Sequence, residues 1–246
     1  INMEKIAIII PSRLSAERLP NKPLKLINNK EMILHVYDIA KLSNVGEVIV
    51  ATPDEEILNL IKTHKGQAVL TSDKHQTGTD RVFEVFESTL QSKPEVIINF
   101  QGDMPNLNSN SIKYLAAHMK KNLCDIATLA SNIENVQEEK DPNVVKVLTS
   151  QEIKNKNFSK ALDFFRTSNR SLNNSTYHHV GIYAFTNKAL IRYVSLKRSK
   201  LEKERKLEQM RAIENKIKID VGYIDSCPLS VDTESDLQAI RKIMEN

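Results

Sequence analysis

The chain has few aromatic residues and only two cysteines, and each shortage argues against a class of protein. Phe, Tyr and Trp make up 5% of the 246 residues, and Trp is absent, which disfavours a base-stacking platform for nucleic acid. Cys124 and Cys227 are too few and too far apart for a disulfide scaffold or a zinc site. We therefore expect a protein of the reducing cytoplasm.

Long hydrophobic runs are also missing. The first apolar run, Ile6–Ile10, is far shorter than the roughly 20 residues of a spanning helix, and no signal-peptide cleavage site follows it. We expect a soluble protein that is not exported and does not insert into a membrane. The net charge of +4 comes from lysines spread along the chain, so this mild basicity does not by itself indicate a nucleic-acid partner.

Short apolar runs alternate with amphipathic segments, which predicts an α/β fold with a mostly parallel sheet covered on both faces. The length suits one large domain over residues 1–246. We predict the following strands and helices in the first half of the chain: strands at 6–10, 47–52, 67–71 and 95–100, and helices at 31–43, 54–65 and 79–92. Thr52–Glu55 reads as a capping box with Pro53 at the first helical position.

The second half is richer in strand patterns, so we expect a β-rich segment at about 125–186. The predicted elements are strands at 125–130, 144–149, 161–165, 179–185 and 217–224, and helices at 188–195, 201–215 and 234–245. Residues 154–177 are polar and lack sustained periodicity apart from 161–165, which predicts a surface loop or a lid.

A basic loop follows the first strand. Arg13, Arg18 and Lys22 fall within ten residues of one another, at the edge of the sheet where open α/β proteins bind ligands. The loop contains prolines but no glycine, so it cannot cradle a phosphate with backbone amides as a Walker loop does. Solvated loop charge is the ordinary interpretation of such a cluster, and side-chain binding of a triphosphate is the alternative that we favour.

Two carboxylates have the setting of a metal site. Asp103 follows the strand at 95–100, next to Gly102, and Asp232 lies just before the last helix. Gly-Asp is also an ordinary turn dipeptide, and Thr233 with Asp236 predicts a helix cap that leaves Asp232 unexplained. Two carboxylates from distant loops make a minimal divalent site.

These motifs resemble the 3-deoxy-manno-octulosonate (Kdo) cytidylyltransferase family, also called CMP-Kdo synthetases, along nearly the whole chain. The resemblance rests on motifs that occur in order: 10–24, 51–52, 75–81, 101–103, 141–147, 179–183, 207–211 and 231–233. It implies a nucleotide-diphospho-sugar transferase-like (Rossmann-like) three-layer fold, with a β-rich insertion serving the dimer and the sugar site. The implied reaction converts CTP and Kdo to CMP-Kdo and pyrophosphate, with Mg²⁺ as cofactor.

The resemblance also implies roles for particular residues. The nucleotide side comprises Arg13, Arg18, Lys22, Arg81 and Gln101, and Asp103 and Asp232 hold Mg²⁺. Arg13, Lys22, Asp103 and Asp232 form the catalytic set. The sugar side comprises Gln101, Arg166, His179, Tyr183, Glu208 and Gln209. Of these, Arg166 is the candidate for the carboxylate of Kdo, because an arginine offers bidentate recognition.

Each sugar-side residue also has a purely structural interpretation. His179 and Tyr183 share one face of a predicted strand and would then form its solvated side. Glu208 and Arg211 are three residues apart on a charged helix and would then form a surface ion pair.

The chain departs from the family pattern at several positions. Asn21 replaces the usual Gly, Met104 the usual Glu and Pro53 the usual Asp, and residues 226–230 lack a glycine. Asn tolerates a positive φ, so the turn at Asn21 is expected to persist. The alternatives are a cytidylyltransferase for another acid sugar, such as a neuraminate, or a nucleotide-binding relative with impaired catalysis. The family further implies a homodimer and a role in lipopolysaccharide synthesis.

Overall fold

A computed structural model describes residues 5–155 and 157–245, and they form two compact units. Unit 1 comprises Ile1–Ala116 and Pro228–Asn246, and unit 2 comprises Ala117–Cys227. The α/β fold class expected from the sequence is confirmed, with helices and a parallel sheet in unit 1 and a mixed sheet in unit 2. That residues 1–246 act as one cytidylyltransferase domain stays a prediction.

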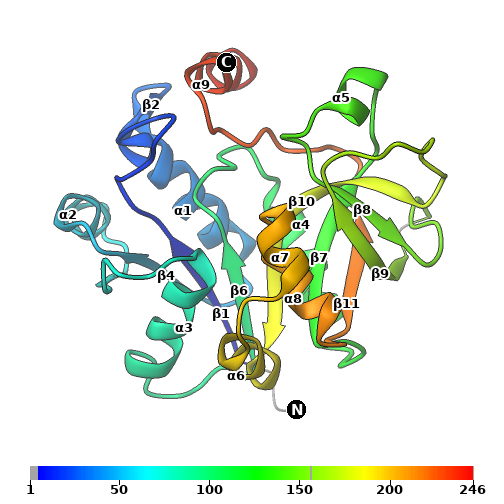
Figure 1. The fold of residues 1–246 in the computed structure, drawn as a ribbon. Coiled ribbons are helices and arrows are strands. Elements are labelled where there is room, and N and C mark those ends of the chain that lie inside the picture. The colour runs from blue at the N-terminus through cyan, green and yellow to red at the C-terminus, as the bar shows by residue number, and fades with distance from the viewer. Residues whose placement is uncertain (1–4, 156, 246) are drawn as a thin grey trace. The chain divides into compact units, whose positions relative to one another are not determined.

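The sheet of unit 1 is parallel, and its strands lie in the order β5–β4–β1–β6 (Figure 1). Their bounds are Ala68–Leu70, Glu47–Thr52, Ile6–Pro11 and Val96–Phe100, close to the predicted ranges. Every residue of β1 is buried, so both faces of this strand are covered, as its continuous run of isoleucines predicts. The carboxyl ends of β1 and β6 therefore meet at one edge of the sheet.

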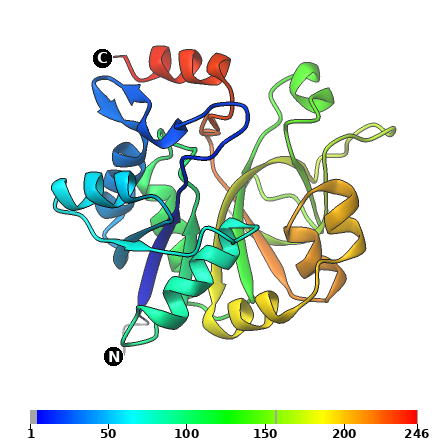
Figure 2. The same cartoon turned by 60° about the vertical axis from the view of Figure 1, so that its left-hand side comes forward.

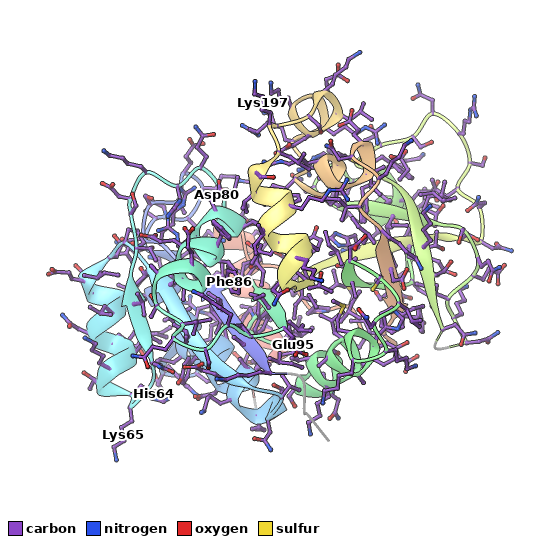
Figure 3. The ribbon with its side chains drawn as sticks, turned by 90° about the horizontal axis from the view of Figure 1, so that it is seen from below. His64, Lys65, Asp80, Phe86, Glu95 and Lys197 are labelled. Carbon is purple, nitrogen blue, oxygen red and sulfur yellow. The ribbon has the colours of Figure 1, made fainter. Side chains whose placement is uncertain are left out.

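The main helices of unit 1 are α1 (Met32–Ser43), α2 (Glu55–Thr63), α3 (Gly78–Ser88) and α9 (Glu234–Ile243). Asp80 and Phe86 lie on α3, and His64 and Lys65 follow the end of α2 (Figure 3). α3 ends before the predicted residue 92, and Lys93 Nζ donates to the Phe86 and Glu87 carbonyls in its last turn at 2.5 and 2.6 Å. α4 (Ser109–Met119), which spans the boundary between the units, was not predicted.

α9 lies beside the small hairpin of β2 (Leu26–Ile27) and β3 (Lys30–Glu31), although some 200 residues separate them in sequence (Figures 1 and 2). Arg241 Nε donates to the Leu26 carbonyl at 2.9 Å. The predicted cap is confirmed, since Thr233 and Asp236 form a capping box at the start of α9. This end of the chain is therefore anchored next to the basic loop and the short helix η1 (Lys22–Leu24).

Unit 2 contains the β-rich part of the chain. Its strands are β7 (Ile126–Ser131), β8 (Lys146–Thr149), β9 (Phe158–Phe165), β10 (Thr176–Thr186) and β11 (Ile219–Tyr223). They pair in the order β10–β7–β11–β9–β8, and β10 also pairs with β8, so the strands close into a ring. β9 and β10 extend into the predicted loop at 154–177, in which Lys156 lies outside the described residues.

The helices of unit 2 are α5 (Val136–Lys140), α6 (Asn187–Ser195), α7 (Lys200–Arg205) and α8 (Gln209–Glu214). α5 was not predicted, and the prediction of one continuous helix over 201–215 is wrong. Lys206 has a φ of 55°, so the chain turns between α7 and α8. A residue in the left-handed region ends a helix because it cannot continue the pattern of i to i−4 hydrogen bonds. Among the described residues, no helix is both long and apolar enough to cross a membrane.

Candidate active site

A pocket of about 400 Å³ opens in unit 1 at the carboxyl ends of β1 and β6. The start of α3 and the segment that leads into α9 also contribute to its lining. The predicted nucleotide and metal residues all line it: Arg13, Arg18, Lys22, Arg81, Gln101, Asp103 and Asp232. We call this space and these residues the anion pocket. Sequence positions more than 200 residues apart thus meet in one place.

Backbone contacts hold the basic loop at the mouth of this pocket. Leu14 N donates to Asp54 Oδ2 at 2.8 Å, and Asn21 N donates to the Leu14 carbonyl at 3.1 Å. Asn21 has a φ of 58°, so the expectation that Asn preserves this turn is confirmed. Arg13 and Arg18 are exposed, which leaves their guanidinium groups accessible to a ligand from solvent.

The predicted capping box at Thr52–Glu55 is wrong. The N-cap of α2 is Asp54, which makes no side-chain cap hydrogen bond, and Pro53 precedes the cap. Thr52 Oγ1 accepts from Asp54 N at 3.1 Å, and the Asp54 carboxylate accepts from Leu14 N instead. The family pattern has an Asp at position 53, where this chain has Pro53. The carboxylate of the next residue, Asp54, holds the basic loop through Leu14 N.

Arg81 is a buried cation in the wall of the anion pocket. Its Nη1 donates to Thr71 Oγ1 at 2.7 Å and to the Ser72 carbonyl at 2.9 Å. Burial lowers the pKa of Arg81, and the charge of Arg13 lowers it further, although an arginine remains charged. Two guanidinium groups that repel each other beside one space are stabilised by an anion between them.

Asp103 and Asp232 face the same pocket with Lys22 close to both. Lys22 Nζ lies 3.3 Å from Asp232 Oδ1, and Ser230 Oγ donates to Asp103 Oδ2 at 3.0 Å. Burial raises the pKa of Asp103, and the Asp232 carboxylate adds to this rise while Lys22 opposes it. An oxygen-only donor set with excess negative charge is what Mg²⁺ prefers. The residues present therefore fit the predicted cation.

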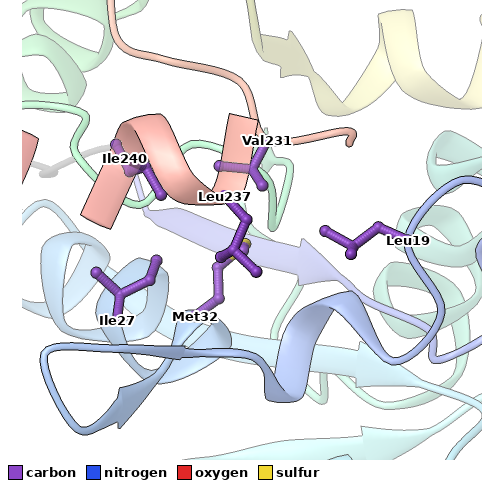
Figure 4. Close-up of a cluster of buried hydrophobic side chains, with 6 residues drawn as sticks. All are labelled: Leu19, Ile27, Met32, Val231, Leu237 and Ile240. Carbon is purple, nitrogen blue, oxygen red and sulfur yellow. The ribbon is translucent and has the colours of Figure 1, made fainter. Parts of the chain in front are cut away.

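A hydrophobic cluster fixes the chain on both sides of Asp232 (Figure 4). Leu19 of the basic loop is buried in it with Val231, which precedes Asp232, and with Leu237 and Ile240 of α9. Ile27 and Met32 complete the cluster. Val231 N donates to the Asp103 carbonyl at 2.8 Å. Asp232 is thus held by a buried neighbour, which explains how a residue outside the helix cap keeps a defined position.

Ser12 was missed by the reasoning from sequence. Its side chain lines the anion pocket and is 7% exposed. Its hydroxyl has no hydrogen-bond partner among residues 5–155 and 157–245, and a buried hydroxyl without a partner is costly. Its position directly after β1, within the motif at 10–24, is the signal in the sequence that points to it.

Met104, at one of the departures from the family pattern, is not among the residues that line the anion pocket. This side chain is 4% exposed and belongs to the buried apolar core. The position after Asp103 therefore contributes packing in this protein, and the acidic pair is formed without it.

The predicted sugar-side residues other than Gln101 belong to unit 2: Arg166, His179, Tyr183, Glu208 and Gln209. None of them is among the residues that line the anion pocket. The His179 and Tyr183 rings lie 5.4 Å apart, and Glu208 acts electrostatically on Tyr183. These three residues are therefore neighbours, as the resemblance implies.

The interpretation of His179 as the solvated side of a strand is wrong. His179 is 8% exposed, and its Nε2 lies 2.9 Å from Thr128 Oγ1. Burial lowers the pKa of His179 to about 3, and the neighbouring His178 contributes to this lowering. The imidazole is therefore neutral at ordinary pH and suits hydrogen bonding rather than charge pairing.

The interpretation of Glu208 and Arg211 as a surface ion pair is also wrong. Arg211 is buried, and its guanidinium donates to both oxygens of Glu202, from Nε at 2.9 Å and from Nη2 at 2.6 Å. Glu202, the partner of Arg211, lies on the preceding helix α7, on the other side of the turn at Lys206. Helix spacing alone cannot reveal such a partner.

Arg166 uses its guanidinium for backbone contacts in this structure. It donates from Nε to the Arg205 carbonyl, from Nη1 to the Pro142 carbonyl and from Nη2 to the Lys206 carbonyl, at 3.1–3.2 Å. Arg166 also lines a second pocket of about 670 Å³ in unit 2, together with Arg170 and Arg205. Recognition of a sugar carboxylate by Arg166 stays a prediction.

Cys124 belongs to a cluster that the sequence does not reveal. The ligand atoms of His118, Cys124 and Asp220 all lie within 4.8 Å of one another. His118 Nε2 lies 2.8 Å from Asp220 Oδ2, and burial raises the pKa of Cys124 to about 12, with Asp220 contributing. Phe158 stacks on the His118 ring at 3.6 Å, where a side chain at Gly222 would collide with it. These contacts describe a buried hydrogen-bonded network.

The parallel sheet of unit 1, with cations and an acidic pair at its carboxyl edge, is typical of an α/β protein that binds nucleotides. The profile of a family described as "Cytidylyltransferase" matches residues 7–219. The chain is 39% identical to the 3-deoxy-manno-octulosonate cytidylyltransferase of Bartonella bacilliformis, covering 98% of both chains. It is 41% identical to that of Rhodopseudomonas palustris, covering 96% of both.

Solved structures agree with these sequence matches. A CMP:2-keto-3-deoxy-manno-octonic acid synthetase complexed with CTP matches with a TM-score of 0.88 and 32% identity, over 98% of both chains. A 4-diphosphocytidyl-2C-methyl-D-erythritol synthase from Anaerococcus prevotii shares the fold at 13% identity, with a TM-score of 0.67 over 99% of both chains. The chain therefore belongs to the cytidylyltransferase family, among the 3-deoxy-manno-octulosonate cytidylyltransferases.

Proposed function

We propose that the protein transfers CMP from CTP to the anomeric hydroxyl of Kdo, giving CMP-Kdo and pyrophosphate. The observation that carries the proposal is the anion pocket, in which Arg13, Arg18, Lys22 and Arg81 line the same space as two carboxylates. The named relatives and the related synthetase complexed with CTP support it.

The chemistry needs what this pocket offers. The anomeric oxygen forms a bond to the α-phosphorus, the bond from that phosphorus to the bridging oxygen breaks, and the hydroxyl proton is lost to solvent. Both substrates are anions that repel each other. The cations of the basic loop and Arg81 neutralise the triphosphate and the charge that grows on the departing pyrophosphate.

Asp103 and Asp232 are the residues that would hold Mg²⁺. When bound, the ion supplies neutralisation of phosphate charge and lowers the pKa of a coordinated hydroxyl. Lys22 links phosphate binding to metal binding. Its ammonium contacts Asp232, and it lines the anion pocket together with the arginines.

The sugar side is assigned to Gln101, Arg166, His179, Tyr183, Glu208 and Gln209. His179 is neutral and Glu208 lies near Tyr183, which suits hydrogen bonds to sugar hydroxyls. The protein is further proposed to act as a homodimer in the cytoplasm, supplying activated Kdo for lipopolysaccharide synthesis.

The test is pyrophosphate release from the purified protein with CTP, Mg²⁺ and Kdo. Reactions with ATP or UTP, without metal, without sugar and with neuraminate are the controls. We expect release only when CTP, Kdo and Mg²⁺ are all present. Release with neuraminate but not Kdo would move the assignment to another acid sugar, and CTP binding without release would indicate a non-catalytic relative.

A further inference from the structure

The turn between α7 and α8 leads into two of the residues proposed to bind the sugar. Glu208 is the N-cap of α8 and Gln209 is its first residue. We call residues 205–209 the α7–α8 corner. α7 and α8 each have only six residues, too few to be stable as isolated helices. Contacts from other residues must therefore fix this corner.

Arg211 and Glu202 join the two helices across the corner. Both side chains are at most 5% exposed, and both carboxylate oxygens of Glu202 accept from Arg211. Glu202 also accepts from Ser199 N at 3.0 Å within the capping box of α7. Burial acts to raise the pKa of Glu202, but the hydrogen bonds and charge of Arg211, together with the hydrogen bonds from Ser199 N and Arg198, lower it overall. The pair is therefore charged, and each partner needs the other.

Tyr193 of α6 supports the same corner from a third direction. The Arg211 guanidinium lies over its ring, 4.5 Å from the centroid, a geometry that favours a cation on an aromatic face. The Tyr193 hydroxyl donates to the Glu208 carbonyl at 2.9 Å, and Arg211 N donates to the same carbonyl at 3.0 Å. Two donors from different elements thus hold the backbone of Glu208.

The fixed backbone places the Glu208 side chain near Tyr183. Burial raises the pKa of Tyr183, and the Glu208 carboxylate adds to the rise. Tyr183 in turn contacts His179 at 5.4 Å between rings. Arg211 and Tyr193 therefore act on the proposed sugar residues without being among them.

We propose that Arg211 and Tyr193 are positioning residues of the acid-sugar site, holding the α7–α8 corner so that Glu208 keeps its place beside Tyr183. The inference rests on the proposed function, because it takes Glu208 as a sugar contact. It adds that recognition of the sugar depends on a buried network of α6, α7 and α8 that does not contact the sugar.

The first test is Tyr193→Phe, which removes the hydroxyl that contacts Glu208 and keeps the ring under Arg211. Its matched control is Tyr177→Phe, which removes another buried tyrosine hydroxyl of unit 2, where Tyr177 Oη accepts from Ile153 N at 3.0 Å. We expect Tyr193→Phe to raise the KM for Kdo about fivefold, the effect of one lost hydrogen bond, with the KM for CTP and kcat within about twofold of wild type. Tyr177→Phe should leave all three constants unchanged.

The second test is Arg211→Lys, which keeps the charge but loses the two-pronged contact with Glu202. We expect a rise of about tenfold in the KM for Kdo. The control is Arg192→Lys on α6, because the Arg192 guanidinium donates to the Asn215 carbonyl. This control should leave the KM for Kdo unchanged. Thermal melting shows whether Arg211→Lys is folded, and Tyr193→Phe decides the question if it is not.

Assays of the wild-type protein distinguish failure of the proposed function from failure of the positioning role. Absence of CMP-Kdo formation by wild type would reject the proposed function itself. A working wild type with an unchanged KM for Kdo in Tyr193→Phe would overturn the positioning role, and so would an equal rise in the Tyr177→Phe control.

Discussion

Lys22 Nζ lies 3.3 Å from Asp232 Oδ1, at the point where the cations and the carboxylates of the anion pocket meet. The ammonium also lowers the pKa of Asp103, against the effects of burial and of Asp232. One lysine thus interacts with both acids of the pair. A divalent ion at Asp103 and Asp232 would compete with Lys22 for Asp232 and free the ammonium for a phosphate.

This competition predicts opposite effects of Lys22→Gln on metal binding and on turnover. Without the ammonium, the nucleotide-free protein should bind Mn²⁺ more tightly, because the acidic pair loses its competing cation. Turnover should fall about a hundredfold in kcat/KM, because the phosphates lose a charge partner. Electron paramagnetic resonance titration of Mn²⁺ and pyrophosphate release measure the two effects. Lys25→Gln is the control. Weaker Mn²⁺ binding together with lower turnover in Lys22→Gln would contradict the prediction.

Asp103→Asn should abolish metal-dependent turnover while the fold persists. A hard anionic ligand is lost at the reacting phosphate, and we expect a loss of at least about a thousandfold. Because burial and Asp232 raise the pKa of Asp103, removing its charge relieves repulsion in the protein without ligands. The melting temperature should therefore stay equal or rise. Asp225→Asn, at an exposed residue of unit 2, is the control, and wild-type rates in Asp103→Asn would refute the metal assignment.

Ser12→Ala should weaken CTP binding without changing the stability of the fold. The Ser12 hydroxyl has no partner among the residues that the structure describes, so its removal should leave the free energy of unfolding within about 0.5 kcal/mol of wild type. The KM for CTP should rise about fivefold if the nucleotide accepts a hydrogen bond there. Ser43→Ala is matched to it, because Ser43 is also buried, at 1% exposure against 7% for Ser12, but donates to the Ala40 carbonyl at 2.6 Å. Ser43→Ala should lower stability and spare the KM. Unchanged CTP binding in Ser12→Ala would show that its hydroxyl does not contact the nucleotide.

His179 predicts a pH dependence of stability. Its pKa falls from 6.5 to about 3 on folding, so between these values the unfolded chain binds a proton that the folded protein does not. The free energy of unfolding should therefore fall as the pH drops below about 6.5, by up to about 1.4 kcal/mol per pH unit from this residue. His179→Gln lacks this contribution. Urea denaturation from pH 7 to pH 4 should therefore show a smaller fall in its free energy of unfolding than in that of the wild type. Parallel curves for variant and wild type would disprove the buried neutral imidazole.

Local sequence features predicted most of the elements. The isoleucine run of β1, the left-handed Asn21 and the capping box at Thr233 each depend on neighbours within a few residues, so the sequence contains their cause. Two of the failures coincide with side-chain contacts that the local sequence pattern does not show. The break between α7 and α8 occurs where Arg211 reaches back to Glu202, and the carboxylate of Asp54 turns away from its own helix to hold Leu14.

The sequence by itself determined the family, the alternation of strands and helices, and the predicted cations and carboxylates that line the anion pocket, because motifs and periodicity are properties of the chain order. Only the tertiary structure decided which residues are neighbours. It placed Lys22 against Asp232, left the Ser12 hydroxyl without a partner in the described chain, and buried Arg211 with Glu202. The physical reason is that burial and pairing depend on distances between segments far apart in the chain, and these distances exist only once the chain has folded.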